Sequence, residues 1–128
     1  MIKEFIPYEQ ALALKELGFK EECAAHYLDE DDLELKWKIY RNLSINTNDC
    51  IQAPTYSQAF RFFREKYNLF GCIDLHISTP IHWYIRIDDI IKNDYIYHSE
   101  DVNLKFNTYE EAELECLKKL IEIANTYE

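Results

Sequence analysis

Aromatic and cationic residues on the polar faces of the predicted elements are the side chains best suited to chemistry. Tyr84 and Arg86 are two residues apart on one predicted strand, so both side chains point to the same face of the sheet, and His82 lies beside them on that face. Tyr, Trp and Arg form strong interface contacts and can also clamp flat anionic ligands. The residues predicted to contact a partner or ligand are Arg86, Tyr84, Trp83, Arg61, Arg64 and Trp37. The alternative is that the arginines only neutralise neighbouring carboxylates.

The sequence contains half of a metal-binding motif. Cys23 and His26 have the spacing of paired zinc ligands, and His76 and His82 would have to complete the site. Structural zinc sites usually combine two such pairs, and no second CxxC, CxxH or HxxxH motif occurs. We therefore expect no bound metal and no other cofactor.

Catalytic signatures are also missing from the sequence. It has no G-x-S-x-G turn and no glycine-rich phosphate loop. Asp88 and Asp89 are adjacent and point to opposite faces of a strand, and the acidic run 29–32 lacks the alternating ligands of a calcium loop. Cys72 and His76 share a strand face but lie about 13 Å apart, too far for a catalytic hydrogen bond. The sequence predicts a protein that is not an enzyme.

The net charge of −10 constrains the partner. Affinity for nucleic-acid phosphates rests on clustered Lys and Arg, so we expect no binding to DNA or RNA duplexes. The same reasoning disfavours an anionic membrane surface, and no apolar run is long enough to span a bilayer. A partner with a basic surface is favoured instead.

Size and cysteine usage indicate a single cytoplasmic domain. The 128 residues, 48% of them hydrophobic, predict one folded domain over 1–128. The N-terminus MIKEFIPYEQ lacks the apolar stretch of a secretory signal. We therefore expect the four dispersed cysteines to be reduced and mostly buried.

A weak repeat marks the start of three predicted helices. The pattern [Pro/Thr]-Tyr-x-[Gln/Glu]-Ala occurs at 7–11, 55–59 and 108–112. Thr55 and Thr108 suit the N-cap position, and each is followed three residues later by Gln or Glu, as in a capping box. In the last helix the apolar stripe consists of Tyr109, Ala112, Cys116, Leu117, Leu120, Ile121, Ile123 and Ala124.

Between the helices, apolar residues alternate with polar ones, which predicts strands. Segments 71–79 and 82–90 indicate a β-hairpin, and 21–29 with 33–41 indicate an earlier one. Segment 102–107 predicts a short extra strand. The face of the later hairpin expected to meet the helices consists of Ile73, Leu75, Ile77, Ile85 and Ile87.

These elements follow the order α-ββ-α-ββ(β)-α. We expect an α+β fold in which three helices pack on one face of an antiparallel sheet of four to five strands.

Three segments resemble a family of small uncharacterised proteins encoded in gut-bacterial genomes and in their phages. They are FIPYEQALALKELGF (5–19), APTYSQAFRFFREKYNLF (53–70) and NTYEEAELECLKKLIEI (107–123). The resemblance covers the helices, not the intervening strands, and brings no catalytic residues. It implies a phage- or mobile-element-associated protein, a kind that often inhibits a host factor or sequesters a nucleotide signal of antiviral defence.

We therefore expect a non-catalytic binding protein that acts on a host protein through its aromatic and arginine surface. The alternative is a small-ligand binder that captures a nucleotide-like molecule at a homo-oligomer interface. In that case the pocket would be lined by Arg86, Arg61, Arg64, Tyr84 and Trp83. An enzyme assembled from scattered residues is the third hypothesis.

Overall fold

The computed structural model describes residues 4–29, 32–35 and 51–127. The chain divides into two compact units, Met1–Ala59 and Phe60–Glu128. The single domain expected from the length of the chain stays a prediction. In the described part of the chain, no helix combines the length and the apolar character needed to cross a bilayer.

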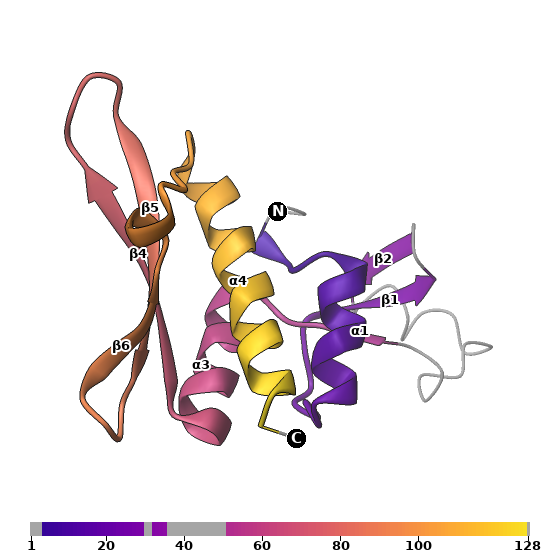
Figure 1. The fold of residues 1–128 in the computed structure, drawn as a ribbon. Helices are drawn as coiled ribbons and strands as arrows, with labels where there is room; N and C mark the ends of the chain where they lie inside the picture. The colour runs from indigo at the N-terminus through magenta and orange to yellow at the C-terminus, as the bar shows by residue number, and fades with distance from the viewer. Residues whose placement is uncertain (1–3, 30–31, 36–50, 128) are drawn as a thin grey trace. The chain divides into compact units, whose positions relative to one another are not determined.

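The first unit combines a helix with a small antiparallel sheet (Figure 1). Helix α1 (Tyr8–Glu16) packs against strand β3 (Ile51–Ala53). Strand β1 (Ala25–Asp29) is central and pairs with β3 on one side and with β2 (Asp32–Leu35) on the other. The predicted first hairpin is therefore confirmed where β1 and β2 pair. The rest of its second strand, with Trp37, lies outside the described residues.

The second unit contains a three-stranded antiparallel sheet in the order β4-β5-β6. The strands are β4 (Leu69–His76), β5 (His82–Asp89) and β6 (Asp94–His98). Helix α4 (Tyr109–Asn125) packs against β4 and β5 and covers one face of the sheet (Figure 1). Helix α3 (Tyr56–Tyr67) leads into β4, and the boundary between the two units falls inside it.

The α+β class and the three helices are confirmed, but the single sheet of four to five strands is wrong. The described strands form two sheets of three strands each. Both edges of β1 are taken by β2 and β3, and both edges of β5 by β4 and β6. No edge of either central strand is therefore left to join the two sheets into one.

The predicted extra strand at 102–107 is also wrong. A 3-10 helix, η3 (Ser99–Val102), and the left-handed Asn103 (φ 58°) turn the chain there. Only Phe106 makes a bridge, to Trp83. The third strand is β6, which lies before this turn.

The predicted helix starts are confirmed by their capping bonds. The Thr55 hydroxyl accepts the Gln58 N–H at 3.2 Å, and the Gln58 side chain accepts the Thr55 N–H at 2.9 Å. The Thr108 hydroxyl accepts the Glu111 N–H at 3.1 Å. Side chains at the start of α3 and of α4 thus satisfy backbone donors that have no partner within the helix, whereas α1 begins after Pro7 without a side-chain cap.

The packing of α4 on the sheet depends on a close approach at Gly71. A Cβ atom there would lie 3.0 Å from both Cys116 Sγ and Leu120 Cδ1. Most of the predicted α4 stripe is buried, namely Ala112, Cys116, Leu117, Leu120 and Ala124. Helix α4 therefore rests on β4 where β4 has no side chain.

Helix α4 does not cover the full length of the β4–β5 hairpin. Ile85 and Ile87 are buried as predicted, but Leu75 is 47% exposed and Ile77 is 81% exposed. Trp83, paired with Leu75, contacts Tyr109 at the first residue of α4. The β4–β5 hairpin extends beyond that end of the helix (Figure 1). The prediction that Leu75 and Ile77 meet a helix is therefore wrong.

The substitution Gly71→Ala should lower the free energy of unfolding by about 1–3 kcal/mol, because the new methyl group overpacks the contact with α4. Urea denaturation followed by circular dichroism measures the loss. The loss should be smaller in a Cys116→Ala background, which removes one of the two clashing atoms. An equal loss in both backgrounds would show that Sγ is not part of the constraint.

Glu113 should make stability depend on pH. Burial, and then the neighbouring Glu110, raises the pKa of Glu113 above its ordinary value, although a hydrogen bond from Tyr109 opposes the shift. The folded carboxyl therefore keeps its proton to higher pH than the unfolded one, so stability falls as the pH rises through that window.

Glu113→Gln should accordingly raise the melting temperature at neutral pH, and the gain should shrink as the pH approaches ~4. Thermal denaturation across this pH range tests it, with the exposed Glu65→Gln on α3 as the control. A gain that is the same at every pH would rule out this ionisation as the cause.

Candidate functional site

The face of the β4–β6 sheet that points away from α4 carries polar, charged and aromatic side chains from all three strands. We call this surface the open face. Cross-strand pairing places Cys72 beside Arg86 and Arg86 beside His98. The residues on the open face are Phe70, Cys72, Asp74, His76, His82, Tyr84, Arg86, Asp88, Tyr95 and His98. The predicted alternation of Tyr84 and Arg86 on one face of β5 is confirmed.

Arg86 lies between two carboxylates at the centre of the open face. Its Nε donates to Asp88 Oδ1 at 3.1 Å, and its Nη1 lies 3.6 Å from Asp74 Oδ2. Burial alone would lower the pKa of Arg86, but Asp74 and Asp88 outweigh it and raise that pKa. The guanidinium is therefore fully charged, and its charge is compensated within the protein.

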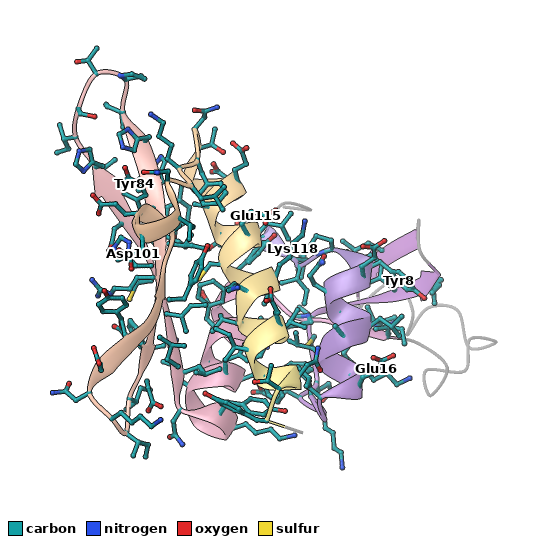
Figure 2. All side chains as sticks on the ribbon, in the orientation of Figure 1. Tyr8, Glu16, Tyr84, Asp101, Glu115 and Lys118 are labelled. Carbon is teal, nitrogen blue, oxygen red and sulfur yellow. The ribbon has the colours of Figure 1, made fainter. Side chains whose placement is uncertain are left out.

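Two histidines and a tyrosine cluster at the hairpin end of the open face. The rings of His76 and His82 stack with centroids 4.7 Å apart. His82 Nδ1 lies 3.0 Å from the Pro80 carbonyl, which can only accept, so this nitrogen carries the proton. His82 Nε2 then accepts from the Tyr84 hydroxyl at 3.2 Å when the ring is neutral. Tyr84 is thereby held in place on the sheet (Figure 2).

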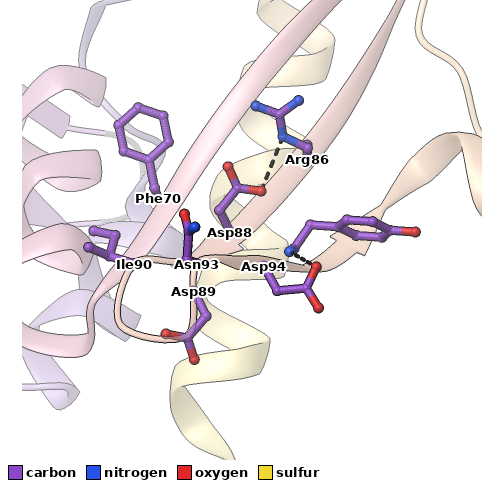
Figure 3. A pocket seen from close by; sticks show the side chains of 8 residues that line it. Phe70, Arg86, Asp88, Asp89, Ile90, Asn93 and Asp94 are labelled. Atoms are coloured by element: carbon purple, nitrogen blue, oxygen red, sulfur yellow. Dashed lines mark hydrogen bonds and ion pairs between the residues drawn. The ribbon is translucent and has the colours of Figure 1, made fainter.

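A groove of about 480 Å³ opens at the other end of the same face. Phe70 and Tyr95 supply aromatic walls, 40% and 52% exposed respectively. Asp88 lies between them, because it pairs with Phe70 on one side and with Tyr95 on the other. Its ion pair with Arg86 is drawn in Figure 3. The complete lining consists of Phe70, Arg86, Asp88, Asp89, Ile90, Asn93, Asp94 and Tyr95. The groove therefore combines apolar ring surface with carboxylates.

The charge of this lining is negative. Three aspartates, Asp88, Asp89 and Asp94, stand against the single arginine, Arg86. Asp89 Oδ1 accepts two backbone N–H groups of the β5–β6 turn, at 2.9 and 3.0 Å. Asp94 Oδ1 accepts the N–H of Tyr95 at 2.8 Å. Backbone donors thus hold two of the carboxylates in position but do not cancel their charge.

A second, smaller hollow of about 210 Å³ lies between the sheet and α4. Its lysines are already engaged. Lys118 Nζ lies 3.1 Å from Glu115 Oε1, both labelled in Figure 2, and Lys119 Nζ lies 3.1 Å from Glu122 Oε1. The groove on the open face is therefore larger and has the less compensated charge.

The structure separates the residues predicted to form the site. Trp83 lies on the α4 side of the sheet, where its ring meets Tyr109 edge-on with centroids 5.3 Å apart. It therefore does not share a surface with Tyr84 and Arg86, because neighbouring strand residues point to opposite faces. Arg64 lies close to the groove, with its guanidinium carbon 5.9 Å from the centroid of the Phe70 ring.

The other two predicted residues lie elsewhere. Arg61 is an exposed residue of α3 and does not line the groove. Trp37 is outside the described residues. Of the predicted set, Arg86, Tyr84 and Arg64 are thus the ones found on or beside the open face.

Sequence reasoning missed the aromatic walls of the groove. Phe70 ends the segment assigned to the middle helix, but the helix stops at Tyr67, and Asn68 (φ 58°) turns the chain into β4. Extending the strand alternation back from Cys72 would have placed Phe70 on the open face. Tyr95 could not have been found this way, because its place opposite Asp88 depends on an irregular register between β5 and β6.

The thiols of the second unit are not poised as nucleophiles. Burial raises the pKa of Cys72, although Arg86, 3.7 Å from its Sγ, opposes the shift. Burial, with a smaller effect from Cys72, raises the pKa of Cys116 to about 12. Both thiols are therefore protonated at neutral pH. Among the described residues, no three His, Cys, Asp or Glu side chains are grouped closely enough to hold a metal ion.

Comparison with known proteins does not extend this picture. No protein-family model, no curated protein and no solved structure matches the chain.

Arg86→Ala should lower the free energy of unfolding by less than about 2 kcal/mol, because ion pairs at partly exposed positions contribute little. The variant leaves the carboxylates of Asp74 and Asp88 without their shared cation. The loss should therefore shrink at high salt, which screens their repulsion.

Urea denaturation at low and high salt measures both effects. Lys92→Ala removes an exposed cation from the β5–β6 turn and is the matched control. A larger loss that does not respond to salt would mark Arg86 as a structural residue of the folded core.

Proposed function

We propose that this chain is a non-catalytic binding protein that captures a basic segment of a partner protein on its open face. The observation that carries the proposal is the groove between Phe70 and Tyr95, which is lined by three aspartates and by an arginine whose charge is already compensated. A lysine or arginine side chain suits both the carboxylates and the aromatic rings of this lining. Its charge is attracted to the carboxylates, and it can stack on an aromatic ring.

The charge of the whole chain supports the same partner. With a net charge of −10, the protein attracts a basic surface from a distance and accelerates encounter. The resemblance of the helical segments to proteins of gut bacteria and their phages makes a host protein the expected partner.

A nucleotide-like ligand is the weaker candidate. Its phosphates would need cations, but Arg86 is held by Asp74 and Asp88. Arg64 is placed against Phe70, and the groove itself is acidic. An anion entering this groove would be repelled by more charges than attract it.

Binding of a basic peptide tests the proposal. An arginine-rich peptide should bind the native protein at low salt in isothermal titration calorimetry, and ATP should not. Asp94→Lys should weaken the peptide about tenfold, which corresponds to about 1.4 kcal/mol. Asp94 lines the groove and is exposed to solvent, so this substitution should leave the fold intact.

Asp101→Lys is the matched control, because it changes the net charge equally at an exposed position of η3 outside the groove. It should weaken the peptide by less than about twofold. Equal weakening by both variants would mean that net charge alone attracts the peptide and that the groove is not the site. Binding of ATP in place of the peptide would favour the nucleotide-like ligand.

A further inference from the structure

Strand β4 is the longest regular edge among the described strands. It has eight residues and pairs with β5 along its whole length without a register shift. The other edge strands, β2, β3 and β6, have four, three and five residues, and the pairing of β6 contains an irregularity. Natural proteins protect edges by keeping them short or by adding bulges, prolines or charged residues. Strand β4 is long and regular and has no proline or lysine, and its one charged residue, Asp74, is paired with Arg86 on the open face.

The backbone groups on this edge can be identified from the far side of β5. The Trp83 N–H and C=O bond to Phe106, both at 2.9 Å, and the Ile85 N–H bonds to Ser99 Oγ at 2.9 Å. The backbone N–H and C=O groups of odd-numbered β5 residues therefore point away from β4, whereas those of even-numbered β5 residues form the hydrogen bonds to β4. It follows from the register that Gly71, Ile73 and Leu75 direct their N–H and C=O groups outward, toward a position for another strand.

Along β4, the side chains on the α4 side are buried at the start of the strand and exposed to solvent at its end. On the α4 side, Leu69 is fully buried and Gly71 lies under Cys116 and Leu120, whereas Leu75 and Ile77 are exposed. An antiparallel copy of the same strand reverses this order. The exposed apolar end of one strand would then lie beside the covered end of the other.

We propose that β4 pairs with β4 of a second copy of this chain, antiparallel and about a two-fold axis through Ile73. In this register, Gly71 stands opposite Leu75 of the partner subunit, and Leu69 stands opposite Ile77 of the partner subunit. Asp74 stands opposite Cys72 of the partner subunit, whereas an axis through Asp74 would set two carboxylates side by side. The outward groups of all three odd residues find partners.

The pairing joins the two sheets into one of six strands with both open faces on the same side. Phe70, which walls the groove, stands opposite His76 of the partner subunit. The dimer thus presents two grooves on one surface and adds a neighbouring side chain to each. The inference is independent of the proposed function, because it rests on the edge of the sheet and not on the charge of the groove.

The oligomeric state tests the proposal. Light scattering after size-exclusion chromatography should give twice the chain mass at micromolar concentration. Leu75→Lys should weaken dimerisation at least about tenfold, because it places a charge opposite the covered end of the partner strand. Ile91→Lys is the control, since Ile91 is also exposed but lies in the β5–β6 turn, and this variant should remain dimeric. A native protein that is monomeric, or a dimer indifferent to Leu75→Lys, would overturn the proposal.

A cysteine variant tests the register. Asp74→Cys should form a covalent dimer under mild oxidation, with bridges between Cys72 and the new cysteine, because directly opposed residues of such a pair have Cα atoms about 4.5–5.5 Å apart. Peptide mass spectrometry identifies the bridge. Asp94→Cys, on β6, is the control and should not cross-link through Cys72. A dimer that instead cross-links Cys72 to Cys72 would refute the axis through Ile73.

Discussion

The structure of the second unit depends on how closely α4 approaches β4. Gly71 has no side chain, and the space a Cβ would need is taken by Cys116 and Leu120. Because the contact is this close, the α4 stripe can bury Ile85 and Ile87 on the same face of the sheet. Covering one face leaves the opposite face to carry the polar and charged residues. Apolar and polar residues therefore alternate along β4 and β5 because one face of the sheet packs against α4 and the other does not.

Charge is distributed unevenly over the open face. Its central cation, Arg86, is shared between Asp74 and Asp88, so the positive charge in the middle of the sheet is fully compensated. The excess negative charge appears at one end, where Asp89 and Asp94 are held by backbone donors of the turn and strand. Aromatic rings stand beside those carboxylates. Compensation at the centre and excess at the end distinguish this groove from a uniformly acidic surface.

The two proposed interactions use different physics and different parts of one sheet. Capture of a basic segment relies on charge and ring surface, which are features of side chains on the open face. Pairing of two copies relies on backbone groups along β4 and on apolar residues that α4 does not reach. Since α4 is too short to cover the whole hairpin, Leu75 and Ile77 remain available for a second chain. Each interaction can therefore exist without the other.

The sequence by itself determined the features that depend on near neighbours. The helix starts at Thr55 and Thr108, the stripe of α4 and the alternation of Tyr84 with Arg86 all follow from spacings of a few residues. Only the tertiary structure decided which strands pair, and therefore that two sheets form instead of one. It also decided that Arg86 is neutralised and that Tyr95 stands opposite Asp88, because cross-strand neighbours are set by register. Register depends on contacts between distant segments, which a local periodicity does not encode.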